Sequence, residues 1–199
     1  MTIYQWRQEW LPQSMQLSLE ANTRVHTSPF TQGVQVLDLL GERWRLSMTL
    51  PERRPQHGAA LEAFIARLRG PSHEVALWHF RRPVPRGTLR GAPTLGAAAG
   101  QGAAVLMLAG CAPGATLLAG DLLGLGEQLL MVAEDGQASA AGELVVPLAN
   151  RVRVVQPVGA AVVWNRPTGR FRLAATAVPV GYRPGAVQPL ELEFLESWT

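Results

Sequence analysis

Turn-forming residues divide this 199-residue chain into short segments, so few stretches leave room for a long helix. Glycine contributes 20 residues and proline 15, spread along the whole sequence. Frequent turn formers between short apolar segments favour many short strands. Because 47% of the residues are hydrophobic, an ordinary fraction for a globular protein, the chain can bury one large core or two small ones. The sequence therefore predicts a mainly β protein.

Apolar and polar residues alternate in several segments near the two ends of the chain. A period of two predicts strands that each have one buried face. These segments are 15–19, 34–36, 44–50 and 190–194, and a further strand is expected at 75–80. The strand Leu190–Phe194 needs a partner, which we expect to be the N-terminal sheet.

Only one segment has a clear helical pattern. Between Gly58 and Arg69, apolar residues recur three and four positions apart, so they fall on one face of a helix. They are Leu61, Phe64, Ile65 and Leu68. The Gly70-Pro71 pair that follows is a typical helix end. We expect this helix to pack its apolar stripe on the first sheet.

The centre of the chain predicts a second group of strands without helices between them. They are expected at 105–108, 116–118, 128–132, 143–146 and 152–155. Glycine and aspartate turns separate them, at a spacing of roughly ten residues, which is typical of a small barrel or sandwich.

The charged residues are segregated along the sequence. Residues 1–90 hold 12 arginines and seven acids, residues 91–150 hold five acids and no arginine, and residues 151–199 hold six arginines and three acids. A change of sign of this kind suggests that the middle is a separate module, although chance clustering is an alternative.

A proline- and glycine-rich stretch at 82–87 coincides with the change in charge and predicts a linker. We therefore expect residues 1–87 and 165–199 to form one discontinuous β domain with the helix 58–69. Residues 88–164 are expected to form an inserted small β-barrel.

All 18 basic residues are arginine. The lack of lysine excludes Schiff-base chemistry and a Walker-type phosphate loop. A net charge of +3 is too small to indicate nucleic-acid binding by itself. The planar guanidinium group suits contacts with carboxylates between subunits.

No combination of residues predicts catalysis, so we expect no catalytic, cofactor-binding or metal-binding residues and no enzymatic activity. The four histidines have no metal-ligand spacing, and a site built from His73, His79 and Cys111 is less expected than a surface histidine and a buried cysteine. The segment Gly96–Gly102 lacks the spacing of a phosphate loop. The six tryptophans are expected to anchor a core or an interface.

Two segments raise the question of a membrane or a secretion signal. Ala103–Leu118 is strongly apolar, but Gly110, Pro113 and Gly114 interrupt it, and a transmembrane helix needs about 20 continuous apolar residues. We expect two short buried strands there, with no direct membrane insertion. The segment Met1–Pro12 carries charges and does not predict a signal peptide.

An ordered set of motifs in the first half resembles a known family. It comprises Ser28-Pro-Phe-Thr31, Val34-Gln-Val-Leu-Asp38, Arg43-Trp44, Met48-Thr-Leu-Pro51 and the helix from Ala59 to Gly70. Together they are similar to the N-terminal half of distal tail proteins and related minor tail proteins of long-tailed bacteriophages and prophages. Weaker motifs, at Ala119–Asp121, Gly142 and Val145–Pro147, resemble the barrel inserted in that family.

This resemblance implies a tail-tube-like β-sandwich or split barrel with one flanking helix, plus the inserted barrel. It implies a structural virion protein of the tail tip or baseplate, assembled in the host bacterial cytoplasm. Such proteins form a homo-oligomeric ring, here expected to be a hexamer with a trimer as alternative. The ring connects the tail tube protein to the tail hub, other minor tail proteins and receptor-binding parts, around a channel through which DNA passes as cargo. The chain is shorter than the larger distal tail proteins, and we expect no second receptor-carrying domain in it.

A nucleic-acid-binding small β-barrel is the alternative function, because the chain is rich in arginine and its middle predicts a small barrel. Its weakness is that the predicted barrel is the acidic segment, whereas a groove for a nucleic-acid strand needs positive charge. An enzyme of unrecognised fold is the third and least supported possibility.

Overall fold

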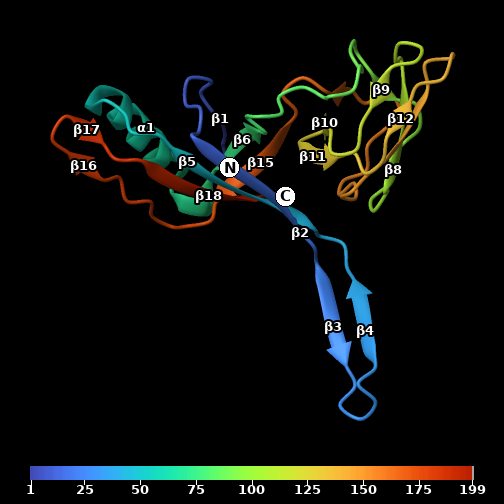
Figure 1. Cartoon of the computed structure of the whole chain (residues 1–199), viewed down its shortest axis with the longest axis horizontal. Helices are drawn as coiled ribbons and strands as arrows, with labels where there is room; N and C mark the ends of the chain where they lie inside the picture. The colour runs from blue at the N-terminus through green and yellow to red at the C-terminus, as the bar shows by residue number, and fades with distance from the viewer. Residues whose placement is uncertain (199) are drawn as a thin grey trace. The chain divides into compact units, whose positions relative to one another are not determined.

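The computed structural model describes residues 1–198 (Figure 1). The protein is mainly β, with a single α-helix, which confirms the predicted fold class. Contacts divide it into two units. Unit 1 comprises Met1–Ser18, Trp44–Pro83 and the chain from Arg166 onward, and unit 2 comprises Leu19–Arg43 and Val84–Asn165.

Unit 1 is built on a six-stranded sheet in the order β1-β6-β15-β18-β5-β2. Its strands are β1 (Ile3–Gln5), β6 (Glu74–Trp78), β15 (Thr168–Leu173), β18 (Leu190–Glu196), β5 (Arg43–Leu50) and β2 (Ser14–Glu20). The β1–β6 pair is parallel, whereas the β6–β15, β15–β18 and β18–β5 pairs are antiparallel. The sheet therefore joins segments from both ends of the sequence.

Strand β18 occupies the centre of this sheet. Leu190 pairs with Leu50 and Leu195 with Arg45 on one side, and Leu173 pairs with Phe194 on the other. This confirms the expectation that Leu190–Phe194 pairs with the N-terminal sheet. Burial alternates along β18 and β5, as the sequence alternation predicts.

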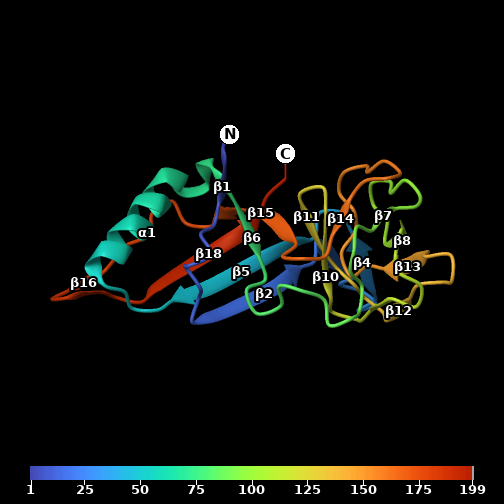
Figure 2. The ribbon, with the colours of Figure 1, turned by 90° about the horizontal axis from the view of Figure 1, so that it is seen from above.

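The helix α1 (Pro55–Leu68) lies along one face of the sheet of unit 1 (Figure 2). Its buried side chains are Leu61, Phe64, Ile65 and Leu68, as predicted. The helix ends at Arg69, which has a left-handed conformation, and a short 3-10 helix η1 (Gly70–Ser72) follows. Beside α1 lies the small hairpin β16 (Tyr182–Arg183) and β17 (Ala186–Val187). A Cβ atom at Gly58 would lie 2.1 Å from Val187 Cγ2, so only glycine permits this close approach.

Aromatic rings fill the space between α1 and the sheet. The ring centroids of Phe64 and Trp10 are 5.1 Å apart, and those of Phe64 and Trp6 are 5.7 Å apart, both in edge-on arrangements. Trp6 donates a hydrogen bond from its indole to the Trp10 carbonyl at 2.9 Å. The polar atom of a buried ring is therefore satisfied, and Trp6 and Trp10 act as core anchors.

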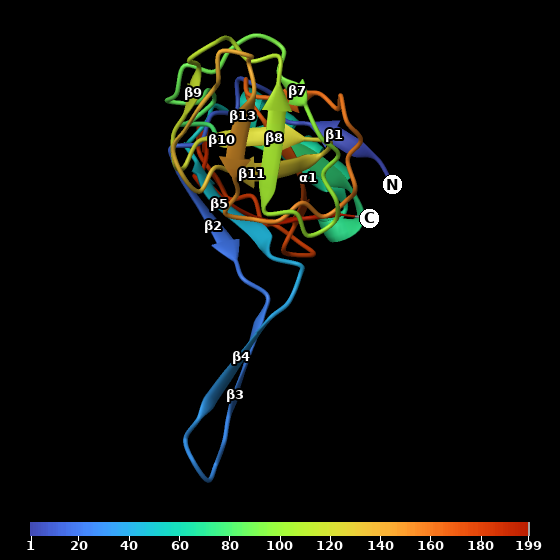
Figure 3. The ribbon, with the colours of Figure 1, turned by 90° about the vertical axis from the view of Figure 1, so that its right-hand side faces the viewer.

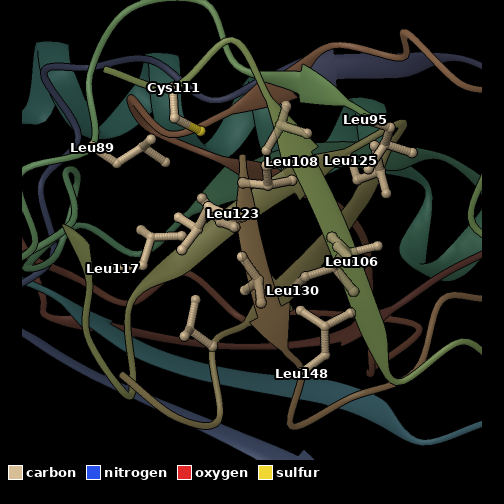
Figure 4. Packing of buried hydrophobic residues seen from close by; sticks show 14 of the residues in the cluster. Leu89, Leu95, Leu106, Leu108, Cys111, Leu117, Leu123, Leu125, Leu130 and Leu148 are labelled. Atoms are coloured by element: carbon tan, nitrogen blue, oxygen red, sulfur yellow. The ribbon is translucent and has the colours of Figure 1, made fainter. Parts of the chain in front are cut away.

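Unit 2 contains three small sheets around one leucine-rich core (Figure 4). Their strands are β7 (Thr94–Leu95), β8 (Val105–Ala109), β9 (Thr116–Leu117), β10 (Leu122–Leu125), β11 (Gln128–Met131), β12 (Gly136–Gln137), β13 (Leu144–Pro147) and β14 (Val162–Val163). The core includes Leu106, Leu108, Leu123 and Leu130. Among the residues described, these sheets share a core but do not close into one hydrogen-bonded barrel. The expectation of a closed small barrel at 88–164 is therefore corrected, because the strands there form separate sheets of two or three strands.

A buried carboxylate, Asp121, binds the chain where the segment Val84–Asn165 of unit 2 begins. Asp121 is only 4% exposed and accepts hydrogen bonds from the backbone N–H groups of Arg86, Gly87 and Leu118 at 2.8, 3.1 and 2.9 Å. The predicted linker is thus bonded to the strands that follow it. Three donors compensate for the cost of burying the acidic group.

The strand predictions for the centre need several corrections. Val152–Val155 is not a strand, because Val154 and Val155 are exposed and only Val152 is buried there. Strand β10 was not predicted, because all four of its residues are buried and its sequence therefore shows no alternation. Strands β7, β12 and β14 were missed because each has only two residues.

Candidate functional site

The most unusual feature of the chain is a two-stranded hairpin with no buried residue. Strands β3 (Thr23–Thr27) and β4 (Val34–Asp38) pair antiparallel, and all ten residues are exposed. Figure 3 shows the hairpin extending away from the packed strands of unit 2, to which it is assigned by its contacts. From the sequence, this segment was expected to belong to the first domain, and Val34 and Val36 were expected to lie on a buried face. That expectation of burial is wrong.

The hairpin has one apolar face and one mixed face. Val25 lies opposite Val36, and Thr27 lies opposite Val34, so these side chains share a face. The three valines are 58–61% exposed. The other face pairs Arg24 with Leu37 and His26 with Gln35. The hairpin therefore presents a valine face whose burial would be favourable.

The tip of the hairpin carries the most exposed aromatic residue of the described chain. Phe30 is 94% exposed, although the loop that holds it is ordered by hydrogen bonds. The Ser28 N–H donates to the Gly33 carbonyl at 2.9 Å, and the Ser28 hydroxyl accepts from the Phe30 and Thr31 N–H groups at 3.4 and 3.3 Å. The loop thus holds a phenylalanine outward rather than folding it onto the hairpin.

An isolated two-stranded hairpin is at best marginally stable in water. This hairpin also leaves the outer edges of both strands without a partner strand among residues 1–198. Unpaired edges and a contiguous exposed apolar face are features of surfaces that pair with another chain. The hairpin therefore combines unpaired strand edges with an exposed valine face and an exposed Phe30.

The base of the hairpin is held firmly within unit 2 by an arginine. The Arg151 Nε donates to Glu42 Oε1 at 3.0 Å, and its Nη2 donates to Glu42 Oε2 at 3.1 Å. The same Nη2 reaches Asp38 Oδ1 at 3.0 Å and the Leu39 carbonyl at 3.1 Å. Arg153 also donates to the Glu42 carbonyl. These bonds fix the point from which the hairpin extends.

The Glu42 carboxylate is the electrostatic centre of this anchor. Burial by itself raises the pKa of Glu42, but hydrogen bonds from the Arg151 side chain and backbone outweigh it and lower the pKa to about 2. The side chain of Glu42 is only 10% exposed, so solvent screens this pair less than a surface pair. The anchor is therefore ionised at neutral pH.

The residues considered as metal ligands lie in separate surroundings. Cys111 is buried in the core of unit 2, and burial raises the pKa of its thiol. His79 belongs to unit 1, where burial and the nearby Arg82 lower its pKa. Residues 1–198 contain no group of three or more histidine, cysteine and acidic side chains placed to hold a metal ion. No helix in this range is long and apolar enough to cross a membrane.

Four of the tryptophans have the core role expected from the sequence. Trp6, Trp10 and Trp44 are at most 3% exposed, and Trp78 is 9% exposed, whereas Trp198 is 43% exposed. Trp164 packs partly against the core of unit 2, where its indole donates to the Gly91 carbonyl at 2.8 Å.

Comparison of the sequence with known protein families gives no match, and comparison with curated proteins gives none either. A function for the chain is therefore inferred from its own residues and their arrangement.

Proposed function

We propose that this protein is a structural subunit of the tail tip of a long-tailed bacteriophage. Copies of the chain form a closed ring around the DNA channel and connect the tail tube to the tail hub and receptor-binding parts. Its role is structural: it holds the neighbouring tail components in place and catalyses no reaction. The single observation that carries an assembly role is the hairpin β3–β4, which exposes an apolar face and Phe30 from a firmly anchored base. The tail assignment rests on the motif resemblance of the first half of the sequence.

A ring of identical subunits requires two different surfaces on each copy, because the subunits join head to tail. A projecting hairpin is suited to be one of these surfaces, since it can contact a different surface on the neighbouring copy and need not meet the neighbour's own hairpin. This feature supports a ring more than a free monomer.

The charge distribution gives less support to the nucleic-acid alternative. The segment Val84–Asn165 of unit 2 holds four arginines against five acids, and two of the arginines, Arg151 and Arg153, bond to Glu42 at the base of the hairpin. A groove that binds a single strand combines positive charge with stacked aromatic rings. Arg90 is already engaged, because it donates to the Gly87 carbonyl at 3.0 Å and lies over the Trp164 ring.

The number of copies in purified tail particles tests the proposal. Particles that contain this chain are dissolved, and peptides from the chain and from the tail tube protein are counted against labelled standards by mass spectrometry. The proposal expects a fixed ring number of copies per particle, six or three. A single copy per particle, or particles without the chain, would contradict it.

A further inference from the structure

The face of the unit 1 sheet that points away from α1 carries a groove of about 600 Å³. Phe194 of β18 points to the α1 side, since its ring centroid lies 6.2 Å from that of Trp6. Side chains alternate along a strand, so Glu191 and Glu193 lie on the opposite face, where they line the groove. Its volume falls within the range of about 300–1,000 Å³ that is usual for ligand sites.

The floor of the groove offers hydroxyl and amide groups. They belong to Ser14 and Gln16 of β2 and to Ser47 and Thr49 of β5. Within residues 1–198, none of these four side chains makes a hydrogen bond. Hydroxyl and carboxamide groups both donate and accept hydrogen bonds, and the amide groups of a polypeptide backbone do the same. The floor is therefore suited to bind an extended segment of peptide.

One carboxylate of the groove has no counter-ion. Glu193 pairs with Arg45, whereas Glu191 is exposed and forms no ion pair within residues 1–198. Thr49 lies directly opposite Glu191 on the neighbouring strand, and no basic residue of the described chain lines the groove. A single free carboxylate complements a single cation, and a guanidinium group can donate to both of its oxygens at once.

The loop 175–179 forms an apolar wall of the same groove. Its start is held in place, because the Ala174 N–H donates to the Glu193 carbonyl at 2.9 Å. The backbone of Thr176 passes so close to Gly70 that a Cβ atom there would lie 3.0 Å from it. An arginine packs its methylene groups on apolar surface while its charged end meets a polar group. The side chains of the wall are those of Ala175, Ala177, Val178 and Pro179.

We infer that this groove binds an extended peptide segment of a partner protein through one arginine. The guanidinium group lies on Glu191, the methylene groups lie against the loop 175–179, and the peptide backbone bonds to the hydroxyl and amide groups of the floor. A polyamine fits less well, because its several ammonium groups need several free carboxylates. The inference goes beyond the proposed ring, since the groove is complete within unit 1 of one copy.

Peptide selection on the purified full-length chain tests the charge of the ligand. A library of short random peptides is selected for binding to the wild-type chain and, in parallel, to Glu191→Gln and Glu191→Arg. The wild type should enrich arginine at one position by about tenfold, the effect of 1.4 kcal/mol, and Glu191→Gln should lose this enrichment. Glu191→Arg should enrich aspartate or glutamate instead, because the sign of the site is reversed. Glu143→Gln, at an exposed acid of unit 2, should select as the wild type does.

Blocking the groove tests the place of binding. Gln16→Trp should weaken binding of a selected peptide, measured by fluorescence anisotropy, by about tenfold or more, because the indole occupies the groove. Gln101→Trp, at an exposed turn of unit 2, is the matched control and should bind as the wild type does. Thermal melting checks that both variants are folded. Selected peptides without a basic residue, equal selection by Glu191→Gln, equal binding by Gln16→Trp, or tighter binding of spermidine than of the peptide would overturn the inference.

Discussion

At the scale of single residues, Glu42 and Arg151 connect two distant parts of the sequence within unit 2. They are 109 positions apart, and their contact holds the base of the hairpin. The Arg151 backbone N–H also donates to Glu42 Oε1 at 2.7 Å, so the carboxylate receives three hydrogen bonds from one residue. An uncompensated arginine at this position would be costly, because breaking a partly buried pair leaves one charge without its partner.

Glu42→Gln should lower the free energy of unfolding of unit 2 by about 2 kcal/mol, because hydrogen bonds to a charged group are lost. Denaturant unfolding and hydrogen exchange at the hairpin base measure the effect. Glu9→Gln is the control, since Glu9 and Arg7 form a well-exposed pair, which contributes little. An equal effect of the two changes would contradict the anchor.

The Glu42–Arg151 pair also makes the stability of the fold depend on pH, and the lowered pKa of Glu42 sets the direction. The folded pKa of Glu42, about 2, lies below the ordinary value of 4.5. Its contribution to stability is therefore complete above pH 4.5 and is lost as the pH falls from 4.5 towards 2. In Glu42→Gln, unfolding experiments should show a smaller loss of stability across this range than in the wild type. An identical pH profile would contradict the role of the carboxylate.

The pairing of Glu42 with Arg151 could not be predicted from the sequence. Charge counts show which segments are basic or acidic, but not which side chains meet after folding. By contrast, the burial of Trp6 and Trp10 was expected from the sequence, because large aromatic side chains usually anchor a core or an interface. The same limit applies to Asp121, whose turn was predicted but whose three backbone donors were not.

At the scale of elements, the sequence predicted the helix and the alternating strands well, but it predicted less well which residues pack against them. All four apolar residues of the α1 stripe were predicted to be buried, and they are. Apolar residues three and four positions apart lie on one face of a helix, and that face packs against the sheet. The alternation in Val34–Asp38 predicted a strand correctly, but a period of two does not state what covers its apolar face. In the β3–β4 hairpin, no residue of the described part of the chain covers this face. Strand β10 was missed for the opposite reason, since both of its faces are buried.

Phe64→Ala should lower the free energy of unfolding by about 3–5 kcal/mol, as truncation of buried phenylalanines does. Phe64 is 8% exposed and contacts Trp6 and Trp10 edge-on. Thermal and denaturant unfolding measure the change. Ala63→Ser, on the exposed face of the same helix, should cost no more than about 0.5 kcal/mol. Unchanged melting of the Phe64 variant would show that the stripe is not part of the core.

Phe30→Ser should separate assembly from stability. Because Phe30 is 94% exposed, its loss should change the free energy of unfolding by less than about 0.5 kcal/mol. Incorporation into tail particles should nevertheless fall, because an exposed aromatic tip is expected to become buried at the interface. Leu11→Ser, at an exposed leucine of unit 1, is the control for incorporation. Equal incorporation of both variants would contradict an assembly role for the tip.

At the scale of the whole molecule, unit 1 is interrupted twice by segments of unit 2. The first interruption, Leu19–Arg43, contains the hairpin, and the second, Val84–Asn165, contains the leucine-rich core. The points where the second segment leaves and returns are adjacent in unit 1, since the Arg166 N–H donates to the Pro83 carbonyl at 2.6 Å. The shift in charge and the proline-rich linker indicated this second segment in the sequence, whereas nothing in the composition indicated the first.

Electron cryomicroscopy of tail particles that contain this chain tests the central claim most directly. The account predicts a closed ring of identical copies on the tail axis, at the junction of the tube and the tip, with the β3–β4 hairpin of each copy buried against its neighbour. A single copy attached away from the axis, or hairpins exposed to solvent in every copy, would contradict it.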